Sequence, residues 1–323
     1  MTQSHHLAAL VDLSPSTAEF RDAVWCGLSQ PQKSIPAKFF YDREGSRLFE
    51  AICETPEYYP TRTEKALLAR IAPEIGALVG SGRTIVEYGS GAGEKIRTML
   101  DNLQDPVGYV PVEISRARLI EVVDELAADY PALHIAPVSA DYTKPFNLPQ
   151  LGSESPRWLG FFPGSTIGNF TLPQANQFLS AARRMLGPGS RFVVGADLRK
   201  DIAILNAAYN DAAGVTAAFN LNLLARINRE LEGTFDLNGF FHRAFYEPEQ
   251  GRIEMHLVSK RVQKASVAGR VFAFSEGETI HTENSYKYDL EQFRGLATSA
   301  GWSHRAVWTD PDRLFSVHLL ACE

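Results

Sequence analysis

A short strand, a glycine-rich loop and a helix follow one another in the first third of the chain. Residues 84–88 form a mostly apolar run that is typical of a buried parallel strand. Gly89, Gly91 and Gly93 come next, and residues 95–103 have the pattern of a helix. Glycines allow the backbone to approach a ligand closely, because a Cβ atom would hold the ligand away. The free N–H groups at the helix start would then point at that ligand.

The loop departs from the fingerprint of dinucleotide-binding proteins. In the pattern G-x-G-x-x-G the third glycine would stand at position 94, where this chain has Glu94. A glycine-rich turn alone occurs in many α/β proteins, so the remaining sequence has to identify the ligand.

Composition and charge exclude several classes of protein. The chain has 323 residues, enough for one large or two ordinary domains, with 45% hydrophobic and 22% charged residues, as in soluble globular proteins. Its net charge of −6 and the lack of a Lys/Arg cluster argue against a nucleic-acid partner. No apolar run approaches the ~20 residues that span a bilayer, so no membrane segment is predicted.

The N-terminus and the cysteines predict a cytoplasmic location. The first residues lack the charged start and long apolar stretch of a signal peptide. Cys26, Cys53 and Cys322 are few and scattered, which predicts a reducing compartment with neither a disulfide framework nor a zinc site. We expect no metal in the functional site.

Strands and helices alternate from residue 82 onwards, which indicates a doubly wound parallel sheet of the α/β class. The expected strands cover 84–88, 108–114, 133–138, 157–162 and 190–196. Helices are expected after the first strand, after the second strand over 115–129 and after the fourth strand over 173–186. In such sheets ligands bind outside the carboxyl ends of the strands.

Polar and acidic residues lie at those strand ends. Glu113 ends the second strand, where a carboxylate can accept hydrogen bonds from both ribose hydroxyls of an adenosine. Asp141 and Tyr142 follow the third strand, where a carboxylate can accept from the adenine amine and a ring can lie on the base. Each acid alone would be interpreted as a solvated strand end. Together with the glycine loop and the loop 163–169, they favour an adenosine ligand.

The alternation is flanked by segments of a different kind. A helix is expected over 16–28, capped by Ser16 or Thr17, and another over 64–79, with a tyrosine-rich polar loop region between them. After residue 199 the pattern predicts helices over 200–230, antiparallel strands over 240–288, a helix over 290–300 and a last strand over 313–321. The simplest architecture has a parallel-sheet domain (62–199 plus 289–323) and a second domain (1–61 plus 200–288), with a substrate cleft expected between them.

The chain resembles one enzyme family over nearly its whole length. It is similar to the histidine-specific, S-adenosylmethionine-dependent methyltransferases that make hercynine, the trimethyl betaine of histidine, in ergothioneine biosynthesis. The resemblance implies a Rossmann-like class I methyltransferase domain and a second, α+β substrate-binding domain. It rests on the strings F-Y-D at 40–42, P-E-Y-Y-P-T-R at 56–62, E-x-G-S-G at 87–91, G-S-T-I-G-N at 164–169, Y-N-D-A-A-G-V-T-A-A-F-N at 209–220, I-E-M at 253–255 and T-E-N-S at 282–285.

The resemblance also implies roles for individual residues. Tyr41 and Asn169 are implied in catalysis. The cofactor S-adenosylmethionine is expected to contact Tyr58, Gly89, Ser90, Lys95, Glu113, Asp141 and Tyr142. The substrate is expected to contact Tyr41, Phe49, Tyr58, Gly164, Asn169, Tyr209, Thr216, Met255, Glu283 and Ser285.

The chemistry of these residue types agrees with an amino-acid substrate. The Asn169 amide and the Tyr209 hydroxyl can hold an α-carboxylate. Glu283 can accept a hydrogen bond from an imidazole N–H, and Ser285 can donate or accept. Because side chains alternate along a strand, Glu283 and Ser285 share one face. We expect a monomer that acts on small molecules, and two alternatives remain: the same chemistry on another amino acid such as tryptophan, or a non-catalytic protein that binds an adenosine ligand.

Overall fold

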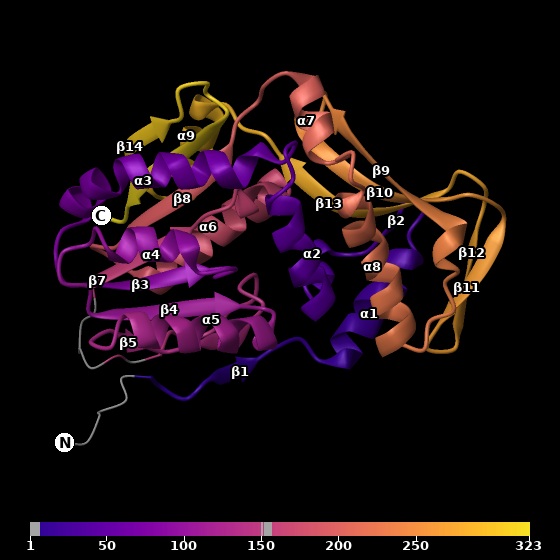
Figure 1. The fold of residues 1–323 in the computed structure, drawn as a ribbon, viewed down its shortest axis with the longest axis horizontal. Helices are drawn as coiled ribbons and strands as arrows, with labels where there is room; N and C mark the ends of the chain where they lie inside the picture. The colour runs from indigo at the N-terminus through magenta and orange to yellow at the C-terminus, as the bar shows by residue number, and fades with distance from the viewer. Residues whose placement is uncertain (1–6, 150, 152–156) are drawn as a thin grey trace. The chain divides into compact units, whose positions relative to one another are not determined.

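The chain divides into two compact units, each assembled from separate stretches of sequence (Figure 1). The computed structural model describes residues 7–149, 151 and 157–323. Unit 1 contains the residues up to Ser14 together with Pro60–Arg199 and Lys287–Glu323. Unit 2 contains Pro15–Tyr59 and Lys200–Tyr286.

Unit 1 is built on a nine-stranded sheet with the order β1-β6-β4-β3-β7-β8-β15-β14, in which β5 also pairs with β4. The strands from β6 to β8 run parallel, and β15 and β14 continue the sheet in antiparallel pairing. The strands are β1 (Val11–Leu13), β3 (Arg83–Tyr88), β4 (Gly108–Glu113), β5 (His134–Ile135), β6 (Val138–Ala140), β7 (Arg157–Phe162), β8 (Arg191–Asp197), β14 (Ser303–Thr309) and β15 (Phe315–Ala321). This architecture confirms the expected Rossmann-like α/β class.

The strand order reverses between β3 and β7. From β3 the chain builds outwards through β4 to β6, and it then returns to place β7 and β8 on the other side of β3. In open α/β sheets such a reversal opens a crevice at the carboxyl ends of the two strands. Gly89 directly follows β3, and the loop with Gly164 follows β7, so both loops lie at this switch point.

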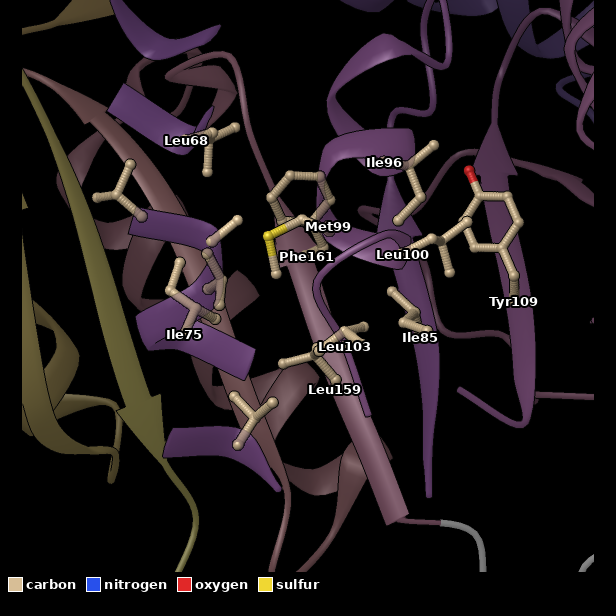
Figure 2. Packing of buried hydrophobic residues seen from close by; sticks show 14 of the residues in the cluster. Leu68, Ile75, Ile85, Ile96, Met99, Leu100, Leu103, Tyr109, Leu159 and Phe161 are labelled. Atoms are coloured by element: carbon tan, nitrogen blue, oxygen red, sulfur yellow. The ribbon is translucent and has the colours of Figure 1, made fainter. Parts of the chain in front are cut away.

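Helices cover both faces of the sheet in unit 1. Apolar residues of α3 (Tyr59–Val79), α4 (Glu94–Leu100) and α5 (Arg116–Asp129) share one buried cluster with β3, β4 and β7. Figure 2 shows Leu68 of α3, Met99 of α4 and Phe161 of β7 within this cluster. On the opposite face α6 (Leu172–Leu186) packs Phe178 against Tyr88, and α9 (Leu290–Ser299) also contributes.

Unit 2 combines a four-stranded sheet, a hairpin and helices. Its sheet has the order β2-β13-β10-β9, and β11 pairs with β12. The long helix α8 packs against α2, β9 and β10, which places one face of the sheet against helices. The strands are β2 (Lys33–Ser34), β9 (Phe240–Glu247), β10 (Arg252–Ser259), β11 (Gln263–Val267), β12 (Arg270–Phe274) and β13 (Thr279–Tyr286). The helices are α1 (Thr17–Leu28), α2 (Arg43–Cys53), α7 (Ile202–Ala208) and α8 (Val215–Glu230). Short 3-10 turns are η1 (Ala37–Phe40) and η3 (Leu237–Gly239) in unit 2 and η2 (Thr166–Asn169) in unit 1.

The tyrosine-rich segment between the first two expected helices is not a continuous loop. It contains the helix α2, whose N-cap is Asp42, where Oδ1 accepts the Gly45 N–H at 2.7 Å. α3 then begins at Tyr59, five residues earlier than expected. The first helix is capped by Ser16, one of the two residues proposed from the sequence, in a reciprocal capping box with Glu19.

The expected N-terminal boundary of the second domain is wrong. Residues 7–14 belong to unit 1, because β1 adds a parallel strand beside β6 with Val11 opposite Val138. The strand β14 was also absent from the expected pattern. The β1 residues are exposed, so they lack the buried apolar run by which the inner strands are predicted.

The apolar layer between α3 and the sheet generates a stability prediction. Replacing Ile75, which is fully buried, by alanine should lower the free energy of unfolding by about 2–5 kcal/mol, because the removed methyl groups leave a cavity. The matched control Leu78→Ala removes a 49% exposed side chain from the same helix and should change it by no more than about 0.5 kcal/mol. Urea unfolding followed by tryptophan fluorescence measures both. Equal losses in the two variants would contradict the described packing.

Candidate active site

The glycine loop after β3 leaves open space above its backbone. Gly89, Gly91 and Gly93 have φ values of 79°, 51° and 75°, which side chains rarely adopt. Among the residues that the structure describes, a Cβ atom on Gly91 would meet no atom within 4 Å, and one on Gly89 would meet the Tyr142 ring alone, at 3.9 Å. A Cβ on Gly93 would instead come within 2.9 Å of Val122, so this glycine serves packing. The first two glycines therefore leave the backbone accessible to a ligand.

A buried carboxylate lies beside this loop. Glu113, at the end of β4, has Oε1 2.9 Å from the Ile114 nitrogen and 3.1 Å from the Ser115 nitrogen, and both N–H groups donate to it. Its Oε2 accepts from the Gly91 N–H at 3.3 Å. Burial raises the pKa of the Glu113 carboxyl, while these three backbone donors act in the opposite direction. The structure thus places Glu113 against the glycine loop, the two features from which the sequence analysis predicted an adenosine ligand.

Asp141 and Tyr142 line the same end of the sheet. The Asp141 Oδ1 accepts from the backbone and the hydroxyl of Thr143, at 3.0 and 2.5 Å, which orients the carboxylate. The Tyr142 ring packs edge-on against Tyr88 and Phe162. The hydroxyl oxygen of Ser90 in the glycine loop is buried and has no hydrogen-bond partner within the described part of the chain, so a ligand group can supply one.

A second buried carboxylate joins the glycine-loop helix to the loop after β7. Glu64 of α3 is 1% exposed, and its Oε2 lies 2.5 Å from the Lys95 Nζ. The Gly164 N–H donates to both carboxylate oxygens, at 2.9 and 2.8 Å. Gly164 thereby lies near Lys95, and the same loop continues into η2, which ends at Asn169. Glu64 was not among the predicted site residues, although it lies two residues after the 56–62 string.

In unit 2 the structure gathers an aromatic group. The ring centroids of Tyr41 and Phe49 are 5.8 Å apart, those of Phe49 and Tyr58 are 6.3 Å apart, and those of Tyr58 and Tyr209 are 6.1 Å apart. Phe219 of α8 contacts the first two rings. These edge-to-face contacts bring Tyr41, Tyr58 and Tyr209 together in one aromatic cluster.

Polar residues of the sheet in unit 2 adjoin these rings. The Tyr209 hydroxyl and the Ser285 Oγ are 2.7 Å apart. Met255 on β10 lies opposite Glu283 on β13. The pKa of the Tyr58 hydroxyl is raised well above its ordinary value, mainly by burial, with contributions from the nearby Tyr209, Cys53 and Glu283 groups. The tyrosines and the β13 carboxylate are thus neighbours.

Thr216, another residue predicted to bind the substrate, lies at the start of α8 in unit 2. Its N–H donates to the Asp211 Oδ1, and the Val215 N–H donates to Oδ2, both at 2.8 Å. Asp211 therefore satisfies the first turn of α8, which has a left-handed glycine, Gly214, as its N-cap.

A cluster of possible cation ligands lies on β10 and β13 of the same sheet. Ligand atoms of Glu254, His256 and His281 lie within 4.8 Å of one another. The Glu254 carboxylate, however, is engaged on both oxygens, by the Arg252 guanidinium at 2.5 Å and by His256 at 2.9 Å. The arginine already supplies the positive charge that this carboxylate needs, so we assign no metal there.

The site residues predicted from the sequence are divided between unit 1 and unit 2. Two residues predicted to bind the substrate, Gly164 and Asn169, belong to unit 1. Tyr58, predicted to contact both ligands, belongs to unit 2. Unit 1 otherwise holds Gly89, Ser90, Lys95, Glu113, Asp141 and Tyr142. Unit 2 otherwise holds Tyr41, Phe49, Tyr209, Thr216, Met255, Glu283 and Ser285.

Comparison with known proteins identifies the family. The family described as "Histidine-specific methyltransferase, SAM-dependent" matches residues 20–322. This chain belongs to that family. The histidine N-alpha-methyltransferases of Mycolicibacterium smegmatis and Mycobacterium tuberculosis are 40% and 38% identical to it, over 94% and 93% of this chain and 95% and 94% of theirs. Ergothioneine biosynthesis protein 1 of Neurospora crassa is 29% identical over 90% of this chain and 33% of its own length.

The group in unit 1 fits the cofactor of this methyltransferase family, S-adenosylmethionine. Glu113 presents a buried acceptor for hydroxyl groups beside the open backbone of Gly91. Ser90 offers an unused buried hydroxyl at the same loop. Within the described part of the chain, no helix has the length and apolar character needed to cross a membrane.

Glu87, directly before this loop, generates a pH prediction. Burial raises the pKa of its carboxyl to about 8, and the Tyr109 hydroxyl donates to it. Between the ordinary pKa of 4.5 and about 8, the folded protein retains a proton that the unfolded chain releases. The contribution of Glu87 to stability therefore falls as pH rises through this window. Glu87→Gln removes this titration, so the difference in free energy of unfolding between variant and wild type should shift in favour of the variant from pH 5 to pH 8.

Urea unfolding at pH 5, 6, 7 and 8 measures this difference. Glu94→Gln, at an exposed position seven residues further on, is the control and should keep the wild-type pH dependence. A constant difference between Glu87→Gln and the wild type across the range would show that Glu87 is ionised throughout.

Proposed function

We propose that this methyltransferase transfers three methyl groups from S-adenosylmethionine to the α-nitrogen of L-histidine and so forms hercynine. This would be the first step of ergothioneine biosynthesis, the process for which the Neurospora crassa relative is named. The observation that carries the proposal is the group in unit 2, where the Tyr209–Ser285 hydroxyl pair and Glu283 adjoin the tyrosine rings. Family membership supports the same substrate.

The polar residues of β13 suit an imidazole ring. A neutral imidazole has one N–H donor and one nitrogen acceptor. Glu283 can accept from the N–H, and the Ser285 hydroxyl can donate to the other nitrogen. An indole has an N–H but no ring acceptor, so it could engage only one of the two. A carboxylate left without a donor in a desolvated pocket is costly, which would exclude side chains that lack an N–H.

The remaining groups suit the α-amino acid part of the substrate. The Tyr209 hydroxyl can donate to the α-carboxylate without adding a charge. Tyr41 and Tyr58 present hydroxyls and ring faces, which tolerate both an amine and a methylated ammonium. Met255, flexible and polarisable, can pack against the imidazole.

Three features of the cofactor match the group in unit 1. Glu113 would accept hydrogen bonds from the ribose hydroxyls, and Asp141 would accept from the adenine amine beside the Tyr142 ring. The glycine loop and Lys95 would face the amino-acid end. When bound, S-adenosylmethionine supplies an activated methyl group on a sulfonium centre.

The chain's part in the reaction would be to position a neutral amine. The α-nitrogen lone pair forms the new N–C bond as the S–C bond breaks, so an ammonium cannot react. Burial and the nearby Glu283 charge keep the Tyr58 hydroxyl protonated at neutral pH, because they raise its pKa. Tyr58 would therefore orient the amine as a hydrogen-bond partner and would not remove its proton, which passes to water. Positioning and desolvation would supply most of the rate enhancement.

Product analysis tests the substrate directly. Purified protein incubated with S-adenosylmethionine and each common amino acid should add three methyl groups, about 42 Da, to histidine alone, as read by mass spectrometry. Methylation of tryptophan in place of histidine would overturn the assignment of the ring pocket. Absence of product with every amino acid would overturn the enzymatic proposal for free amino acids.

The role of Glu283 can be tested by an isosteric change. Glu283→Gln should lower kcat/KM for histidine roughly 10–100-fold, because it replaces a charge-assisted hydrogen bond worth about 1.5–3 kcal/mol. Affinity for S-adenosylmethionine, measured by calorimetry, should stay within about twofold. Glu276→Gln, at an exposed position just before the same strand, is the control and should behave as wild type. An equal loss of cofactor affinity in Glu283→Gln would remove Glu283 from the substrate site.

A further inference from the structure

A chain of hydrogen bonds, half-buried at His242 and fully buried at Asn220, begins at the backbone carbonyl of Tyr209. The His242 Nε2 lies 2.8 Å from the Tyr209 carbonyl oxygen, and its Nδ1 lies 2.9 Å from the Asn220 Nδ2. A carbonyl can only accept, so Nε2 carries the proton and Nδ1 accepts from the asparagine amide. Burial lowers the pKa of His242, which agrees with this neutral form.

Asn220 of α8 connects this series of hydrogen bonds to the sheet of unit 2. It is fully buried, and its Nδ2 also donates to the His256 carbonyl at 3.1 Å. Its Oδ1 accepts from the Thr282 hydroxyl at 2.8 Å. Both amide protons and the amide oxygen of Asn220 are therefore used, and each bond fixes a different strand of unit 2.

This series of hydrogen bonds ends at an irregularity in β13. Met255 lies opposite Glu283, but the next residue of β10, His256, lies opposite His281, so Thr282 has no partner in the register. The Thr282 Oγ1 also lies 3.0 Å from the Met255 carbonyl. On the other side of the bulge, the His281 Nε2 contacts the Glu283 carbonyl at 3.0 Å. Such a bulge shifts the pairing by one residue and re-aims the side chains that follow it.

The bulge determines which residues share a face. In a regular strand Thr282 and Glu283 would point to opposite faces. Thr282 turns towards α8, where it bonds Asn220, and Glu283 faces the tyrosines on the same side of the sheet as Ser285. A slip of one residue would remove the carboxylate from this face.

We propose that Thr282, Asn220 and His242 are positioning residues that set the spacing between the two ends of the substrate site. The inference rests on the proposed function, in which Tyr209 holds the α-carboxylate while Glu283 and Ser285 hold the ring. His242 fixes the Tyr209 backbone, and Thr282 fixes the bulge beside Glu283. Asn220 links His242 to Thr282, so this series of hydrogen bonds sets the length of the amino acid that fits.

The test removes the Thr282 hydroxyl from this series of hydrogen bonds. Thr282→Val keeps the shape of the side chain and removes the hydroxyl, which donates to the Asn220 Oδ1 and lies 3.0 Å from the Met255 carbonyl. We expect KM for histidine to rise about tenfold, because one buried hydrogen bond is lost and its acceptor is left unpaired. Calorimetric affinity for S-adenosylmethionine should not change, and discrimination between histidine and longer or shorter amino acids should weaken. Thr282→Ser retains the hydroxyl and should restore the wild-type KM.

Two further variants separate positioning from folding. Thr279→Val makes the same change on the same strand, where the hydroxyl accepts from the exposed Gln32 side chain at 3.1 Å, and it should leave KM unchanged. His242→Phe keeps a ring and breaks the chain at its other end, so it should raise the histidine KM as Thr282→Val does. It also provides the test if Thr282→Val fails to fold.

The outcomes distinguish this inference from the proposed function. A folded Thr282→Val or His242→Phe with a lower melting temperature and wild-type histidine KM would overturn the positioning role. Wild-type protein that methylates no histidine would overturn the proposed function, and the inference with it. Wild-type activity on histidine with a raised KM in both variants supports both.

Discussion

The carboxylate of Glu64 holds together the two loops at the switch point of unit 1. It is almost fully buried, and a buried carboxylate is tolerated only when it is paired and hydrogen-bonded. Lys95 supplies the charge, and the Gly164 N–H supplies hydrogen bonds to both oxygens. One residue of α3 thus fixes the helix that follows the glycine loop and the loop that leads to Asn169. The geometry of both loops depends on this interaction.

The sequence predicts the centre of the parallel sheet better than its edges. The inner strands are buried on both faces, so β3, β4 and β7 appear as apolar runs separated by helices. The edge strand β1 has three exposed residues and gains its structure only from pairing with β6. The helix α2 was missed because its tyrosine-rich, glycine-containing surroundings favoured a loop, although Asp42 caps it.

The candidate site shows the same division between local and long-range information. Glu113 could be predicted because it ends a strand beside a glycine loop, and the structure gives it a contact to Gly91. Glu64, Asn220 and His242 could not, because each acts through a partner distant in the sequence. Glu64 contacts Gly164 a hundred residues away, and Asn220 contacts Thr282 across 62 residues. Only the fold brings these pairs together.

In the proposed reaction, the hydroxyl pair of Tyr209 and Ser285 also determines how the substrate ring is recognised. The two oxygens are 2.7 Å apart, so one hydroxyl must donate to the other. The Tyr209 hydroxyl donates in this pair. When the substrate binds, Tyr209 would turn its single proton to the α-carboxylate, and the Ser285 hydroxyl would then donate to the ring nitrogen that lacks a hydrogen, while Glu283 takes the N–H. An indole, which has no ring acceptor, would leave the Ser285 proton unused.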